Sequence, residues 1–223
     1  MRADAAQLYV RLSEGEMKKV IVVFANSVKH KKHCIAGKEI QTKQWIRPVG
    51  NSAGAELDYN QCICENPYGK FPVKLLQKVE IDLAENTPLA NQPENFLIGS
   101  GLWTQKYRIE EYEIVHYLDK PDSLWGTGNR VAFYQIDNGT IKIEQSLYLV
   151  KVENLEIYKN MDKRRASFSY NGNHYDLPVT DPNFEKYIQN PKYQSILCVS
   201  LGEKYDSAGG ENYSCYKIVV AIF

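Results

Sequence analysis

The sequence contains no long hydrophobic run. No stretch approaches the roughly 18 consecutive apolar residues that a membrane-spanning helix needs, and the first residues lack the apolar centre of a signal peptide. We therefore expect a cytoplasmic protein with no membrane partner.

The chain also lacks an excess of charge of either sign. Its 27 Lys and Arg residues balance 27 Asp and Glu residues, so the formal net charge is zero. This balance excludes long-range attraction of the whole chain to nucleic acid. Any surface that binds nucleic acid must therefore be a local basic patch.

Cysteine is scarce, and so are patterns that would hold a metal or a nucleotide phosphate. The five cysteines are an odd number in a chain much larger than disulfide-dependent scaffolds, so we expect reduced thiols. No two pairs of Cys or His residues have a typical zinc spacing. The segment GTGNR at 126–130 lacks the lysine of a phosphate-binding loop. We expect no metal and no cofactor.

What the chain does contain is a series of short runs rich in β-branched and aromatic residues, which favour strands. Apolar and polar residues alternate in 75–83 and across 140–158, as in half-buried strands. The dipeptide Asn171-Gly172 predicts a hairpin in which Ala166–Tyr170 pairs with His174–Leu177. The other strand-like runs are 20–24, 33–40, 44–49, 195–202 and 215–223.

Helical patterns are few. Residues 102–118 have apolar and aromatic positions compatible with a helix, and residues 181–189 begin with an aspartate cap and a proline in the first turn. Many short strands with one or two helices are typical of small barrels or sandwiches. We therefore expect a mainly β protein with minor α content.

The most plausible domain boundary is the segment 121–130, which contains proline and glycine between the longer helical candidate and the second set of strands. A chain of 223 residues is long enough for two small domains. The expected parts are a poorly ordered extension at 1–16, a first domain with a helical insertion at 17–122 and a second domain at 130–223.

A set of segments along the chain is distinctive: SVKHKKHCIAG, QWIRPV, NQPENFLI, DSLWGTGNRV, YNGNHYDLPVTDP, ILCVSLGE and CYKIVVAI. In this order they resemble the bacterial and archaeal dual-OB-containing domain family, from about Lys18 to Phe223. The resemblance implies two small OB-like barrels in tandem and a role in binding or sensing nucleic acid. It further implies a place in a prokaryotic defence system, with an effector protein as a partner. Asn91 stands where the family pattern has a histidine, which counts against catalysis by that position.

The first candidate binding site is the basic segment 26–34, which we expect to form a loop between two strands. Its Ser27 hydroxyl and the ammonium groups of Lys29 and Lys32 suit phosphate oxygens. In an OB barrel this first hairpin flanks the ligand face. The alternative is a solvated basic turn.

The second candidate is the pair Trp45 and Arg47. The two residues lie two positions apart in a strand-like run, so their side chains face the same side. Together they offer a ring on which a base can stack and a planar cation for phosphate or guanine. Alternatively, Trp45 belongs to the core and Arg47 either extends along it to solvent or pairs with Glu56.

The second half of the chain adds three candidates. Arg165 leads into a strand on which Phe168 and Tyr170 share a face, a basic and aromatic pattern found in proteins that bind single strands. The same alternation is also typical of a core hairpin. Lys217 lies in an otherwise apolar terminal strand and needs a partner, for which Asp181 or Glu203 is available.

Catalytic residues are not identified by any pattern. Cys34 follows His33 and the lysine cluster, which would lower the pKa of its thiol and activate it as a nucleophile, and Cys198 lies near Ser200 in a strand-like run. The alternative is that these thiols are buried and inert. We expect a nucleic-acid-binding or nucleic-acid-sensing module, with single-stranded nucleic acid favoured as the partner. Two alternatives stay open: an enzyme that acts on a nucleotide or nucleic acid through a Ser, Lys, Cys or Asp site, and a protein-interaction adaptor.

Overall fold

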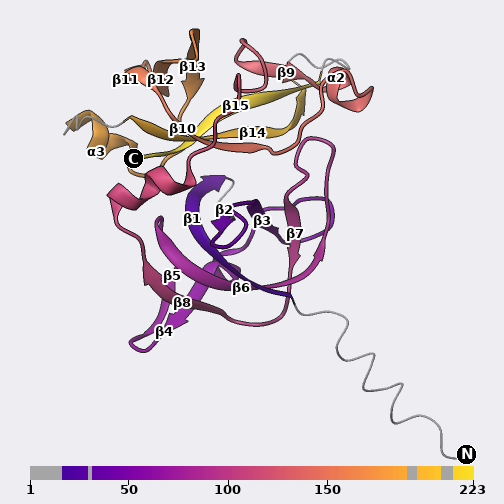
Figure 1. Cartoon of the computed structure of the whole chain (residues 1–223), viewed down its shortest axis with the longest axis vertical. Helices are drawn as coiled ribbons and strands as arrows, with labels where there is room; N and C mark the ends of the chain where they lie inside the picture. The colour runs from indigo at the N-terminus through magenta and orange to yellow at the C-terminus, as the bar shows by residue number, and fades with distance from the viewer. Residues whose placement is uncertain (1–16, 30–31, 190–194, 207–212) are drawn as a thin grey trace, which may run out of the picture.

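A computed structural model of the chain describes residues 17–29, 32–189, 195–206 and 213–223. The extension expected at 1–16 lies outside the described residues. Within them the chain is mainly β, and its N-terminal half, drawn in indigo to magenta, lies against its C-terminal half, drawn mostly in orange to yellow (Figure 1). No described helix is long and apolar enough to cross a membrane.

The N-terminal half is a closed barrel. Its strands follow the order β1-β2-β3-β7-β6, and β6 pairs with β1 to close the ring. Strands β3 and β7 are parallel, whereas the other neighbours in the ring are antiparallel. This is a Greek-key barrel of the OB type. The strands are β1 (Met17–Lys29), β2 (Lys32–Glu39), β3 (Trp45–Val49), β6 (Gln77–Asn86) and β7 (Asn95–Ile98).

Further strands extend this sheet beyond β6. Strand β8 pairs with β6, β4 pairs with β8 in parallel, and β5 forms the outer edge against β4. The 3-10 helix η1 leads into β4, and η2 follows β8. The bounds are η1 (Tyr59–Cys62), β4 (Ile63–Asn66), β5 (Gly69–Pro72), β8 (Trp103–Arg108) and η2 (Glu111–Tyr117).

The C-terminal half repeats the connectivity of the first barrel. Strands β10 and β11 together take the place of a first strand, and β12, β13, β14 and β15 follow. Strand β14 lies between β10 and β15. The end of β13 meets β15 through one parallel bridge, Val179 to Val219, so the ring closes with far less pairing than in the first barrel. Strand β9 pairs with the N-terminal part of β15, on the edge that faces away from β14.

The bounds of these elements place helices at two connections. Helix α2 follows β9, and helix α3 lies between β13 and β14. The elements are β9 (Arg130–Ala132), α2 (Phe133–Asp137), β10 (Leu147–Lys151), β11 (Glu153–Asn160), β12 (Lys163–Tyr170), β13 (Asn173–Pro178), α3 (Phe184–Gln189), β14 (Ile196–Asp206) and β15 (Tyr213–Ile222).

Strand β1 is buried on both of its faces. Ile21 and Val23 belong to the core inside the first barrel, whereas Val22 and Phe24 belong to a second cluster outside it. That outer cluster also contains residues of the C-terminal half, including Leu149. The continuous apolar run of β1 therefore serves two cores, because successive side chains of a strand point to opposite faces. The two barrels share a hydrophobic interface.

Several predictions from the sequence are confirmed. The hairpin pairs Ala166 with Leu177 and Tyr170 with Asn173, as Asn171-Gly172 indicated. The terminal strand β15 is buried on both faces, with Val219 in the second barrel's core and Val220 at the interface. The domain bounds 17–122 and 130–223 stay a prediction.

Three predictions are wrong in detail. Residues 102–118 form β8 and η2 instead of one long helix, because Trp103 fills the first barrel's core and β8 pairs on both sides. Residues 140–146 are not strand, although Ile143 packs in the second core. Segment 26–34 is not one loop, since β1 continues to Lys29 and β2 begins at Lys32.

Candidate functional site

A cavity of about 150 Å³ lies between the two barrels. One wall comes from β1, β2 and β3 of the first barrel, and the opposite wall comes from β10, β14 and β15 of the second. The loop between β6 and β7 contributes Gln92. Most of the lining is apolar, including Ala36 and Val220, whereas Ser27 and Arg47 bring polar groups. The site exists only where the two halves meet.

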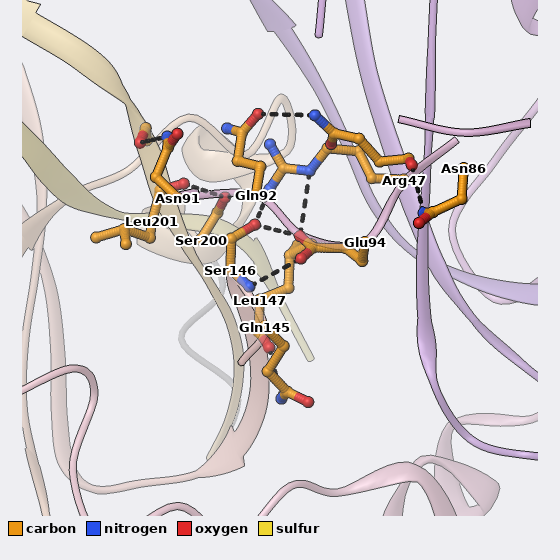
Figure 2. Close-up of polar contacts among 12 residues, drawn as sticks. Arg47, Asn86, Asn91, Gln92, Glu94, Gln145, Ser146, Leu147, Ser200 and Leu201 are labelled. Carbon is orange, nitrogen blue, oxygen red and sulfur yellow. Dashed lines mark hydrogen bonds and ion pairs between the residues drawn. The ribbon is translucent and has the colours of Figure 1, made fainter. Parts of the chain in front are cut away.

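Arg47 joins the first barrel to the second through its side chain. Its Nη2 atom donates to the hydroxyl oxygens of Ser146, at 2.9 Å, and Ser200, at 3.0 Å. Its Nε atom lies 3.5 Å from the Glu94 carboxylate. Glu94 also accepts from the backbone N–H and from the hydroxyl of Ser146, so these residues form one buried network (Figure 2). The pairing with Glu56 suggested by the sequence is wrong.

The loop between β6 and β7 holds the cavity's amide groups in place. Asn91 donates from Nδ2 to the Gly202 carbonyl of β14 at 3.3 Å, so the loop is attached to the second barrel. Gln92 is 2% exposed, and its Oε1 accepts from Asn95 at 3.4 Å. In Figure 2 the Gln92 side chain lies beside the guanidinium group of Arg47. Sequence analysis did not identify Gln92 or Glu94 as site residues, because their partners are distant in the chain.

The basic hairpin of β1 and β2 leads away from this cavity. Ser27 pairs with Cys34, and both residues line the cavity. Two residues farther along each strand, Lys29 pairs with Lys32. The Lys29 side chain lies outside the described part of the chain. The Lys32 ammonium lies 3.3 Å from the Asp58 carboxylate, and both side chains are exposed.

Trp45 does not offer an open stacking surface. Its side chain is 4% exposed and belongs to the cluster between the barrels. Its Nε1 donates to Asp119 at 3.1 Å, and the same carboxylate binds the ammonium of buried Lys38 at 2.5 Å. Burial lowers the pKa of Lys38, although Asp119 opposes this shift. The expected shared face of Trp45 and Arg47 is correct, but the second barrel covers it.

The β12–β13 hairpin holds its aromatic residues in the core. Phe168 is fully buried and stacks on Tyr175 with ring centroids 5.6 Å apart. Tyr170 is 8% exposed and donates its hydroxyl to the Pro121 carbonyl. Arg165 binds Asp176 with 3.0 Å between Nη2 and Oδ2. This hydrogen bonding raises the pKa of Arg165. The core interpretation of this hairpin holds, which removes Tyr170 as a stacking surface.

Lys217 is fully buried, and its contacts differ from the expected ones. Its ammonium donates to the carbonyl oxygens of Gly126, at 2.7 Å, and Gly128. Asp181 is not its partner, because that carboxylate accepts from the backbone N–H groups of Asn183 and Ile222. Burial lowers the pKa of Lys217 to about 8. The lysine anchors the segment between the barrels and is closed to a nucleic acid.

The buried cysteines do not have activated thiols. Burial raises the pKa of Cys62 to about 12 and that of Cys215 to about 11, and it raises the pKa of Cys198 as well. These thiols are therefore protonated at neutral pH. Cys34 is half-buried at the cavity wall. The described residues contain no group of three or more His, Cys, Asp or Glu that could hold a metal.

Comparisons with known proteins agree with this architecture. The profile of a family described as the dual OB-containing domain matches residues 19–222. A search of curated proteins finds no match. Among solved structures, the crystal structure of the p204 HINb domain is similar over 92% of each chain, with 8% identity and a TM-score of 0.36, a likeness too weak to support an argument. Since the profile spans nearly the whole chain, this protein belongs to the dual OB-containing domain family.

Proposed function

We propose that this protein is a nucleic-acid-binding module whose binding surface follows the β1–β2 hairpin to the cavity between the barrels. One observation carries the proposal. The rung Ser27–Cys34 lines the cavity, and the rung Lys29–Lys32 lies farther out on the same hairpin. Lysine ammonium groups suit the phosphates of a nucleic-acid strand that approaches the cavity along this hairpin.

The chemistry of the hairpin supports binding of phosphates. Residues 29–32 read Lys-His-Lys-Lys in the sequence, and the backbones of Lys29 and Lys32 form the last described rung of the hairpin. The contact of Lys32 with Asp58 is between exposed groups, and such pairs contribute about 0–1 kcal/mol. A phosphate can therefore replace Asp58 at little cost. OB barrels commonly use this first hairpin and the neighbouring strands for single-stranded ligands.

Two further parts of the proposal concern the type of nucleic acid that binds and the biological role of the protein. Single-stranded nucleic acid is favoured over duplex, because an unpaired nucleotide can leave its stack and reach a narrow cavity whereas a base pair cannot. The dual OB family resemblance supports a sensing role in prokaryotic defence, in the cytoplasm and with an effector protein as partner. We retain these as predictions.

The test is fluorescence anisotropy with labelled single-stranded and duplex DNA and RNA at about 50 and 200 mM salt, a range over which phosphate-driven binding weakens strongly. We expect single strands to bind in a salt-dependent manner. The double variant Lys29→Ala, Lys32→Ala should lower the affinity and reduce the salt slope by up to about 2, roughly 1 for each phosphate contact.

A matched control comes from the equivalent hairpin of the second barrel. The double variant Lys163→Ala, Arg164→Ala changes the same number of charges on the β12 strand but away from the cavity. It should bind like the unmodified protein. The proposal is wrong if no polymer binds, or if the two double variants weaken binding equally while both melt normally.

A further inference from the structure

The cavity between the barrels can hold one ring of a nucleobase. Its volume is about 150 Å³, enough for a benzene-sized ring, and because the cavity is partly open to solvent the second ring of a purine can lie in its mouth. Its walls come from both barrels and combine small side chains with branched aliphatic ones, which suit contact with a flat ring. The apolar walls include Ala25, Ala36, Leu147, Ile218 and Val220.

Hydrogen-bond donors lie at the polar side of the same cavity. Arg47 uses Nη2 for Ser146 and Ser200, and its Nη1 donates to none of the described residues. Gln92 accepts through Oε1 from Asn95, which fixes the amide so that its Nε2 is available as a donor. Ser27 adds a hydroxyl on the side of the hairpin, and Thr180, Ser200 and Glu203 are further polar residues of the lining.

This arrangement favours one kind of ring edge. With the Gln92 oxygen held by Asn95, the groups that Arg47 and Gln92 can present are donors, and they match a ring edge that carries acceptors. Guanine presents two acceptors, O6 and N7, on one edge, so Nη1 of Arg47 and Nε2 of Gln92 can each donate to one of them. Adenine carries an amino donor at the corresponding position and would leave one donor unpaired.

We infer that the cavity is a nucleobase site that prefers guanine and holds the base between the two barrels. The inference rests on the proposed function when the base belongs to a bound strand, whose phosphates then follow the hairpin past Lys32. The same chemistry also fits a free guanine nucleotide. The experiment distinguishes the two sources.

Cys34 supplies a direct readout on the unmodified protein. It is the half-buried cysteine at the cavity wall, whereas the other four cysteines, all within the described ranges, are buried. Alkylation of Cys34 by N-ethylmaleimide can be followed by mass spectrometry, and a base in the cavity should slow it. The probes are GMP, AMP, and single strands of equal length that contain either one guanine or none.

We expect GMP or the guanine-containing strand to protect Cys34, with AMP requiring about tenfold higher concentration because adenine leaves one donor unpaired. Ala25→Leu fills the cavity and should remove the protection, while salt-dependent binding through Lys29 and Lys32 persists. Gln92→Met removes one donor with little change in volume and should reduce the preference for guanine. If Ala25→Leu does not fold, protection of Cys34 in the unmodified protein still tests the site.

The possible outcomes separate the two proposals. If strands bind in a salt-dependent manner but neither GMP nor a guanine-containing strand protects Cys34, the nucleobase site is refuted and the proposed function stands. If GMP protects Cys34 but no strand binds, the site holds a free nucleotide and the proposed function is wrong. Equal protection by AMP and GMP would refute the preference for guanine.

Discussion

The first hairpins of the two barrels occupy the same place in the same fold, yet their basic residues have different surroundings. In the second barrel, Lys159 and Arg164 both contact Glu185, and Arg165 binds Asp176. In the first barrel, Lys32 contacts Asp58 and the hairpin continues into the cavity. Basic residues of both hairpins have acidic partners, so what distinguishes the first hairpin is the cavity that adjoins it.

The two barrels also differ in how they use a buried arginine or lysine. The first barrel directs Arg47 outward into a carboxylate and hydroxyl network that reaches the second barrel. The second barrel directs Lys217 into its own interior, where backbone carbonyls accept from it. Both cations are shielded from water, but only Arg47 has a carboxylate nearby. The stability of the protein should depend on these groups in different ways.

The largest expected effect comes from a substitution that breaks the network between the barrels. Glu94→Ala leaves Arg47 without its carboxylate in a position where both side chains are largely buried, 13% and 5% exposed. Removing one partner of a buried ion pair costs about 3–5 kcal/mol of the free energy of unfolding. Urea denaturation of the variant and the unmodified protein measures this loss of stability.

Asp176→Ala is the matched change in the second barrel, where Arg165 and Asp176 are 22% and 36% exposed. A partly exposed pair contributes about 0–1 kcal/mol, so this variant should be nearly as stable as the unmodified protein. Equal losses for Glu94→Ala and Asp176→Ala would contradict the distinction between the two arginines.

A second, smaller effect concerns the pH dependence that Lys217 causes. Its pKa is about 8 in the folded protein against 10.5 in an unfolded chain. Between these values this side chain holds its proton in the unfolded state but not in the folded one, so the contribution of Lys217 to the free energy of unfolding should rise with pH. From pH 7 to 9.5 the rise is about 2 kcal/mol. Denaturation at several pH values, compared with Lys217→Met, measures this contribution.

The comparison variant defines what would contradict the second prediction. Lys217→Met has no titrating group at this position, so the difference in stability between the unmodified protein and this variant should change with pH by this amount. The buried cysteines, whose raised pKa values act in the opposite direction, contribute equally to both proteins. Parallel curves for the two proteins would mean that Lys217 titrates normally. The range stops below pH 10 because burial raises the pKa of tyrosines such as Tyr148, to about 12, and their titration in the unfolded chain opposes the trend.

The smallest expected effect concerns the turn that sets the β12–β13 hairpin. Gly172 has a φ of +75°, and no atom beyond its chain neighbours lies within 4 Å of the position that a Cβ would occupy, so only backbone strain opposes a larger residue. Gly172→Ala should cost about 1 kcal/mol. Gly128→Ala is the control, since Gly128 has no such φ and a Cβ would make ordinary contact at 3.8 Å. Thermal melting that is equally affected in both variants would rule out strain as the cause.

Local sequence patterns predicted the strands well and the long-range partners poorly. Asn171-Gly172 placed a hairpin correctly, because the turn conformation depends on those residues alone. Residues 102–118 were expected to be helical, since their apolar spacing suits a helix, but strand pairing on both sides and burial of Trp103 outweigh that preference. Arg47 was recognised as a candidate, whereas Glu94 and Gln92 were not.

The amino-acid sequence by itself determined the β-rich character, the turn of the second hairpin, the basic segment at 26–34 and the dual OB family, because these depend on neighbouring residues or on motifs read along the chain. Only the tertiary structure decided which of the candidate residues meet. Ser27 and Arg47 line one cavity, whereas Trp45 and Lys217 are buried. The physical reason is that the alternation of residues along a strand determines which face of the sheet a side chain lies on. The packing of the second barrel then determines whether that face meets solvent, a cavity or a core.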